Sequence, residues 1–171
     1  MRVGTFFVRV WRFLSVVGLV FALINSYISY PGEVAVLFNS VGQATSYLGR
    51  ETLFYASVAV FLVNNILINS ITRLIPKLPM SQIPVPPVWV NHRDELNEIV
   101  VNWFYALMAS VNTILGLSLM VLSFLNRSDF RVDQYTYSWL LPLSVFMLAS
   151  VILALPIRLI LMKPVSNNDY V

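Results

Sequence analysis

Charge and cysteine are what this sequence lacks most. Only 11% of its 171 residues are charged, whereas soluble globular domains carry roughly 25%. So few charged side chains could not cover a folded domain in water, which excludes a water-soluble monomer. The absence of cysteine excludes a disulfide scaffold, iron–sulfur ligation and a thiol nucleophile. With 58% hydrophobic residues, the composition indicates an integral membrane protein.

Nucleotide-binding and catalytic motifs are also missing. The sequence contains no G-x-x-x-x-G-K-[ST], G-x-G-x-x-G or H-E-x-x-H pattern. Its single histidine, His92, excludes bis-histidine haem ligation within the chain. The basic residues lie in ones and twos at the edges of apolar runs and form no stripe, which argues against nucleic-acid binding. We therefore expect neither an enzyme nor a cofactor-binding protein.

Four windows without Asp, Glu, Lys or Arg divide the chain, at residues 13–32, 52–72, 99–126 and 134–157. A transmembrane helix needs about 20 mostly apolar residues, so each window is long enough for one span and too short for two. The first window is interpreted as a span and not as a signal peptide, because no convincing cleavage site follows it. The sequence predicts an all-α membrane protein, a single domain over residues 1–171, with spans at about 11–30, 52–73, 98–125 and 137–162.

The basic residues also predict how the helices are oriented. Cytoplasmic loops carry an excess of Lys and Arg, so the side with more of them is expected to face the cytoplasm. With both termini inside, the outer loop covers residues 31–50 and the proline-rich inner loop covers residues 75–91. The inner side then holds eight basic residues and the outer side three, which favours an orientation with both termini inside, N-in and C-in. The inner residues are Arg2, Arg9, Arg12, Arg73, Lys77, Arg93, Arg158 and Lys163, and the outer residues are Arg50, Arg127 and Arg131.

The two longer loops differ in character. Residues 34–38 of the outer loop form a short β-prone run, and residues 39–42 are typical of a turn. We expect a strand that lies on the membrane surface or pairs with a partner, because a lone strand in lipid cannot satisfy its backbone. Five prolines crowd the inner loop between Pro76 and Pro87, which predicts extended, polyproline-like chain.

Polar residues inside the predicted spans are mainly asparagines. Asn64, Asn65 and Asn69 lie in the second span, and Asn112 lies near the centre of the third. Depth permits contact between Asn112 and the first two. One interpretation is hydrogen bonding between helices, and the other is an intramembrane polar site for a small ligand or headgroup. The first is the commoner use of asparagine in membranes, and both stay open here.

The start of the third helix carries a second candidate site. Asn91 is expected to cap the helix, with acidic residues in the first turns that favour the helix dipole. His92, Glu95 and Glu98 recur at intervals of three, so they could also hold a metal ion on one helical face. A lone histidine beside two glutamates at a helix start is far more often capping and solvated charge, so no metal site is predicted. Asn126-Arg127-Ser128 fits a glycosylation sequon, which we interpret as chance because it abuts the third span.

The first outer loop resembles a known family. Val34-Ala35-Val36-Leu37-Phe38-Asn39, Gly42-Gln43 and Tyr47-Leu48-Gly49-Arg50 resemble the pattern V-P-x-H-[FW]-N…G-x-P-D…Y-G-x-K. That pattern belongs to an uncharacterised small bacterial membrane-protein domain found at the N-terminus of SdpI-type immunity proteins, which protect producers of a sporulation-delay toxin. Leu37 stands where the family has histidine, and Ala44-Thr45 where it has Pro-Asp.

The resemblance covers roughly residues 10–125 and implies a non-catalytic protein of the bacterial inner (cytoplasmic) membrane. It implies a role in immunity or signalling and a set of partner or ligand contacts in the outer loop. A structural interpretation of the same positions is a turn in the loop and a cap on the second helix. The positions are Phe38, Asn39, Gly42, Tyr47 and Arg50.

The sequence is compatible with three hypotheses about function. The leading hypothesis is a protein that presents its outer loop to a partner or a membrane-active peptide. The second is an accessory structural subunit of a larger membrane complex, respiratory or secretory, with other membrane subunits and the lipid bilayer as its partners. The third is a small transporter or lipid-handling protein that uses the four asparagines.

Overall fold

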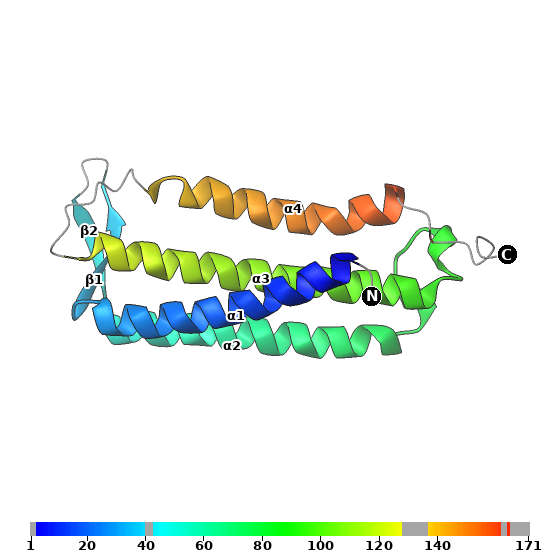
Figure 1. Cartoon of the computed structure of the whole chain (residues 1–171), viewed down its shortest axis with the longest axis horizontal. Helices are drawn as coiled ribbons and strands as arrows, with labels where there is room; N and C mark the ends of the chain where they lie inside the picture. The colour runs from blue at the N-terminus through cyan, green and yellow to red at the C-terminus, as the bar shows by residue number, and fades with distance from the viewer. Residues whose placement is uncertain (1–2, 40–42, 128–136, 162–163, 165–171) are drawn as a thin grey trace.

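The structure, a computed structural model, describes residues 3–39, 43–127, 137–161 and 164. Four long helices run side by side, and a two-stranded sheet follows the first helix in the chain (Figure 1). In chain order the elements are α1 (Val3–Ser29), β1 (Glu33–Phe38), β2 (Ala44–Gly49), α2 (Arg50–Leu74), α3 (Arg93–Leu125) and α4 (Leu140–Leu161). All four helices are long and apolar enough to cross a membrane. Even the shortest, with 22 residues, reaches about 33 Å at 1.5 Å per residue. The predicted four-helix membrane fold is confirmed.

Two helices begin well before the spans predicted for them. α1 begins at Val3 and α3 at Arg93, because a charged residue ends an apolar run without ending a helix. Arg9 and Arg12 therefore lie on α1. The predicted cap at Asn91 is wrong, since His92 occupies the N-cap position of α3 and makes no side-chain cap bond.

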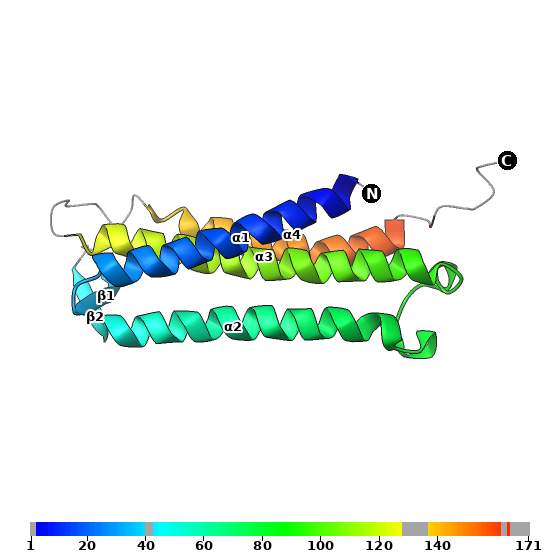
Figure 2. The same cartoon turned by 60° about the horizontal axis from the view of Figure 1, so that its bottom comes forward.

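The helices form an elongated bundle with α3 at its centre. α1 packs most closely against α3, and α4 also rests on α3, while α2 lies on the other side of the bundle (Figure 2). α1 and α3 approach each other closely at Gly116, where a Cβ would be in van der Waals contact with the Cα of Leu19, at 3.6 Å. Leu19, Ala22, Leu23 and Leu119 form the apolar core at this crossing. The outward faces of the helices carry exposed large apolar side chains, as expected for a lipid-facing surface.

The two ends of the bundle are different. The β1–β2 hairpin lies at one end, and the start of α1 and the end of α4 lie at the other, together with the proline-rich segment between α2 and α3 (Figure 1). This arrangement places the N- and C-terminal ends of the chain on the same side of the bundle. Which side faces the cytoplasm remains the prediction made from the basic residues.

The proline-rich segment is more folded than expected. It contains three short 3₁₀ turns, Ile75–Lys77, Met80–Gln82 and Pro87–Trp89, joined by extended residues. Proline suits the first position of such a turn because its fixed φ fits and no N–H is needed there. Trp89 is only 1% exposed, and its indole N–H donates to the carbonyl of Leu159 in α4 at 2.9 Å. Its burial fixes the segment against α4.

The hairpin confirms the strand predicted at residues 34–38 and corrects how it is paired. β1 pairs antiparallel with β2 of the same chain, a pairing that the sequence did not predict. The second strand was missed in the sequence, although Thr45 and Tyr47 are β-formers that follow the turn at a spacing typical of a hairpin. The register shifts at two places, between Ala35 and Leu37 and between Leu37 and Phe38.

Candidate functional site

Asn126 fixes the hairpin to the bundle. At the C-terminal end of α3, its Oδ1 accepts the N–H of Ala35 at 2.8 Å, and its Nδ2 donates to the carbonyl of Ala35 at 3.0 Å. The side-chain amide thereby takes the place of a neighbouring strand along the edge of β1. The same Nδ2 donates to the carbonyl of Leu122 at 3.0 Å. Asn126 is therefore a structural residue, although the sequence marked it only as part of a chance sequon.

This contact determines which way the backbone of β2 points. Ala35 lies opposite Tyr47 in the ladder. Opposite residues of an antiparallel pair alternate between pairs that exchange two hydrogen bonds and pairs that exchange none. Because both backbone groups of Ala35 bind Asn126, Ala35 and Tyr47 form a pair that exchanges no backbone hydrogen bonds. The bond from Arg50 N–H to the carbonyl of Gly32, at 2.9 Å, fits the same alternation. Tyr47 consequently directs its own N–H and C=O away from β1.

The outer edge of β2 carries no paired strand among the residues that the structure describes, since the sheet has two strands. Tyr47 is 55% exposed, Leu48 42% and Leu37 61%. An unpaired strand edge that carries exposed apolar side chains is a template for pairing with another extended chain.

The residues predicted to contact a partner lie in different parts of the hairpin. Phe38 and Asn39 are half-buried and Tyr47 is exposed, while Gly42 lies outside the described residues. Asn39 organises the turn, since its Oδ1 accepts the N–H of Gln43 at 2.9 Å and its own N–H donates to the carbonyl of Gln43 at 2.9 Å. The geometry of Asn39 matches the turn interpretation, and Tyr47 is the predicted contact that the hairpin leaves accessible.

Arg50 ties the hairpin to the ends of two helices. It is the first residue of α2, and its Nη1 donates to the carbonyl of Tyr30 at 3.5 Å. The guanidinium also lies over the ring of Tyr27, 5.1 Å from the ring centre. Tyr30 is itself buried and donates its hydroxyl to the carbonyl of Leu119 at 2.9 Å. These contacts place Arg50 in a structural position between α1 and α2.

Three of the four predicted asparagines meet in the middle of the bundle. Asn112 is 1% exposed, and its Oδ1 accepts from the Nδ2 atoms of Asn64 at 2.9 Å and Asn65 at 3.1 Å. Its Nδ2 donates to the Oδ1 of Asn65 at 3.3 Å. Asn64 and Asn65 also donate to the backbone carbonyls of Met108 and Phe61. The amides bind one another across α2 and α3, an arrangement that favours a helix-joining role.

Asn69 belongs to a different cluster, which the sequence did not reveal. Its Oδ1 accepts from Nη2 of Arg12 at 3.0 Å, and the Arg12 guanidinium lies over the ring of Tyr105, 4.1 Å from the ring centre. The Thr72 hydroxyl lies 3.4 Å from the Tyr105 hydroxyl. Arg12 thus links α1, α2 and α3 nearer the termini than the asparagine group. The only sequence signal was a charged residue at the edge of an apolar window.

The start of α3 uses its polar residues to contact α1. Thr5 donates to Oε1 of Glu98 at 2.6 Å and accepts from Nδ2 of Asn102 at 2.9 Å. Glu98 therefore has a partner on α1. Among the residues that the structure describes, no three His, Asp or Glu side chains are grouped so that they could hold a metal ion, and the set of His92, Glu95 and Glu98 is not such a group.

No protein-family model, curated protein or solved structure matches this chain.

Proposed function

We propose that this chain is a non-catalytic integral membrane protein that binds a membrane-active peptide through the free edge of its hairpin, in an immunity or signalling role. The observation that carries the proposal is the pair of bonds from Asn126 to both backbone groups of Ala35, from which the outward direction of the Tyr47 N–H and C=O follows through the register. A peptide that lies extended beside β2 would pair with these two groups and place its side chains against Tyr47 and Leu48. Addition of a strand to a free sheet edge is a common mode of peptide recognition.

The way the hairpin is held favours this role. Asn126 and Arg50 fix it to the helix ends, so little chain ordering is needed when a peptide binds, and pre-ordered sites bind more tightly for the same contacts. The resemblance of residues 34–50 to the outer segment of SdpI-type immunity proteins points to the same surface. With the predicted N-in orientation in a bacterial inner membrane, the hairpin faces the envelope, where such peptides arrive.

Complementation of a gene deletion tests the proposal. We expect the deletion strain to become sensitive to envelope-active peptides and the wild-type gene to restore resistance. Tyr47→Pro removes the outward N–H and leaves the ladder to β1 intact, because this N–H does not bond β1; proline is tolerated at such edge positions. We therefore expect a folded protein that no longer protects.

Two further variants separate the backbone from the side chain. Tyr47→Ala keeps the outward N–H and should protect partially. Leu48→Pro removes an N–H that points into the ladder opposite Val34 and should disrupt the hairpin itself. Unchanged peptide sensitivity on deletion, or full protection by Tyr47→Pro, would refute the proposal.

A second candidate, an accessory subunit of a larger membrane complex, is favoured by α4. Only 6% of its most apolar stretch is buried in the bundle, and large side chains such as Leu141 and Phe146 are more than 70% exposed. A neighbouring subunit could cover this face as well as lipid does. Extraction in a mild detergent followed by a native gel distinguishes the two, since a subunit migrates with its complex and a lone 19.4 kDa chain does not.

A further inference from the structure

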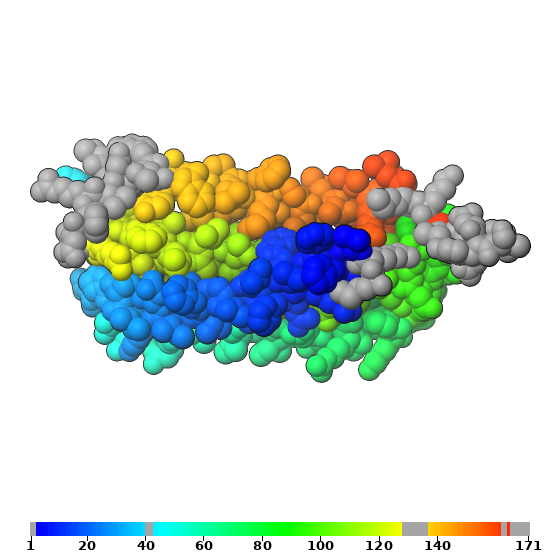
Figure 3. All heavy atoms as spheres, viewed as in Figure 1, coloured from blue at the N-terminus to red at the C-terminus, as the bar shows by residue number. Residues whose placement is uncertain are grey.

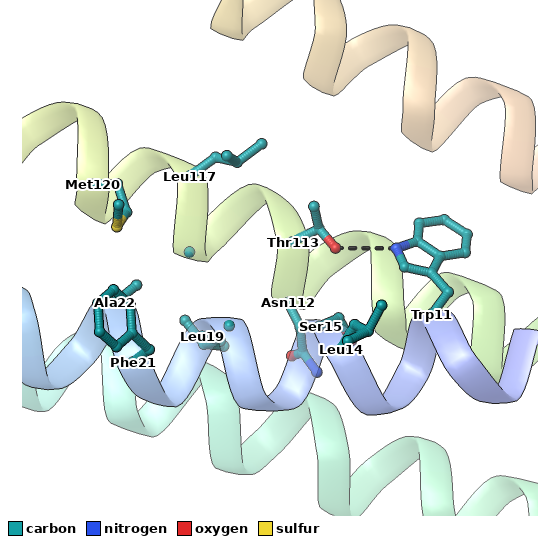
Figure 4. A pocket seen from close by; sticks show the side chains of 12 residues that line it. Trp11, Leu14, Ser15, Leu19, Phe21, Ala22, Asn112, Thr113, Leu117 and Met120 are labelled. Atoms are coloured by element: carbon teal, nitrogen blue, oxygen red, sulfur yellow. Dashed lines mark hydrogen bonds between the residues drawn. The ribbon is translucent and has the colours of Figure 1, made fainter.

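Two cavities lie along α3, the larger against α1 and the smaller between α1, α3 and α4. Figure 3 shows α3 exposed between α1 and α4 in the half of the bundle nearer the hairpin, while the first part of α1 lies over α3 in the other half. The larger cavity, about 390 Å³, lies between α1 and α3 and extends from Trp11 to Met120. Figure 4 shows its side chains projecting from the two helices, with the indole of Trp11 reaching across to Thr113 at one end. A volume of this size is within the range of small-molecule sites in proteins.

The smaller cavity, about 140 Å³, lies nearer the chain termini and involves α1, α3 and α4. It is lined by Val8 on α1, by Asn102 and Trp103 on α3, and by Arg158 on α4. The two cavities are lined by positions 8, 11, 14, 15, 18, 19, 21 and 22 of α1 and by positions 99, 102, 103, 106, 112, 113, 116, 117 and 120 of α3. Most of these positions have another one three or four residues away, which is the spacing of one helix face, so the cavities follow one another along the two helices and are together called the groove.

Gly18 keeps the larger cavity open. Glycine weakens a helix interior, and packing does not require it here, because a Cβ at Gly18 would meet no atom within 4 Å. Gly116 is different, since a Cβ there would contact the backbone of Leu19. The consequence of glycine at position 18 is therefore free space in the groove.

The polar groups in the larger cavity already have partners. The Thr113 hydroxyl accepts from the indole N–H of Trp11 at 3.2 Å and donates to the carbonyl of Ala109. The Ser15 hydroxyl donates to the carbonyl of Arg12. Asn112 binds the other asparagines. None of the twelve lining residues is charged. The cavity consequently offers an apolar surface to an occupant without charge.

We propose that the groove holds one phospholipid, with an acyl chain in the larger cavity and an anionic headgroup paired with Arg158. Arg158 is the one charged residue among the described residues that line the two cavities, and it lies near the end of α4 that reaches the termini. The groove thus runs from a cation at the bundle end toward an apolar cavity in its middle. A lipid of that leaflet has the same polarity along its length.

The volume of the larger cavity favours an acyl chain over a helix of a second copy. The cavity follows α1 from Trp11 to Ala22, a rise of about 16 Å. A helix is about 10 Å wide, so a helix of a second copy would insert only side chains into a 390 Å³ cavity of that length. A single hydrocarbon chain is much narrower than a helix.

Native mass spectrometry of the purified full chain tests the proposal. The delipidated protein is mixed with equal amounts of phosphatidylglycerol and phosphatidylcholine that carry the same acyl chains. We expect wild type to retain one lipid and to prefer phosphatidylglycerol by roughly tenfold, as a charge-assisted hydrogen bond allows. Arg158→Gln should remove the preference and still retain lipid. Gly18→Leu should fill the cavity and reduce retention of both lipids by at least roughly tenfold.

The controls use matched positions outside the groove. Gly4→Leu makes the same change at another open position of α1, and Arg73→Gln removes a cation at the same end of α2; both should behave as wild type. If Gly18→Leu does not fold, as judged by circular dichroism and gel filtration, Leu117→Trp fills the same cavity from α3. Wild-type retention in a folded cavity-filling variant overturns the proposal. So does an unchanged preference in Arg158→Gln, or a wild-type dimer that retains no lipid.

Discussion

The asparagine group in the centre of the bundle allows a quantitative prediction. Asn112→Leu removes three side-chain hydrogen bonds, to Asn64 at 2.9 Å and to Asn65 at 3.1 and 3.3 Å. Hydrogen bonds between transmembrane helices contribute about 0.6 kcal/mol each on average, so the three together contribute about 2 kcal/mol. An unpaired buried donor costs a further 1–3 kcal/mol or so, and the change leaves an N–H of each partner without its acceptor. We expect Asn112→Leu to lower the free energy of unfolding by at least about 2 kcal/mol, and by more where the two unpaired donors add their own cost.

Titration with sodium dodecyl sulfate in mixed micelles, followed by circular dichroism, measures this difference. In a double-mutant cycle with Asn64→Leu, the coupling energy should be about 1 kcal/mol, because each variant removes the partner of the other. Replacing Asn64, Asn65 and Asn112 together with leucine should cost less than the sum of the single changes, since no amide is then left unpaired. Ser70→Leu, on the exposed face of α2, is the control and should change little. A loss below about 0.5 kcal/mol for Asn112→Leu, or a coupling near zero, would refute the helix-joining role.

Three other predictions concern single contacts. Asn126→Leu removes both bonds to Ala35 and should release the hairpin at a cost of about 2 kcal/mol, visible as faster amide exchange of β1 with α1 and α3 still protected. Trp89→Phe removes the bond to the Leu159 carbonyl and should make the proline-rich segment more susceptible to limited proteolysis, while helix content stays the same. Gly116→Ala should leave stability within about 1 kcal/mol, whereas Gly116→Leu should cost about 1–3 kcal/mol by overpacking against α1, as measured by the same detergent titration.

The number and extent of the helices follow largely from the sequence. Charged residues bound each apolar window, and a window of about 20 residues has one way to cross a bilayer. The outer strand was also predicted, because β-branched and aromatic residues precede a turn. Helix ends were predicted less well, since Arg9 and Arg12 interrupt the hydropathy of α1 and do not interrupt its backbone hydrogen bonds.

The contacts of individual polar residues could not be predicted in the same way. Asn112 was expected to lie at the depth of Asn64 and Asn65, and depth was enough to bring the three together. Asn69 donates to the backbone carbonyl of Asn65 one turn away, but its Oδ1 accepts from Arg12 of α1, and the spacing of residues within α2 does not indicate a contact with another helix. Asn126 contacts a residue 91 positions away, and no local pattern in the sequence indicates such a pairing.

Photo-crosslinking in living cells tests most directly whether the hairpin edge is the binding surface. A photoreactive amino acid replaces Leu48 on the exposed side of β2, and a second strain carries it at Leu141, a lipid-exposed position of α4. On exposure to an envelope-active peptide, we predict a peptide adduct from position 48 and not from position 141, and the adduct should disappear when Tyr47→Pro is added. An adduct of equal strength with and without Tyr47→Pro, or none at position 48, would contradict the proposed function.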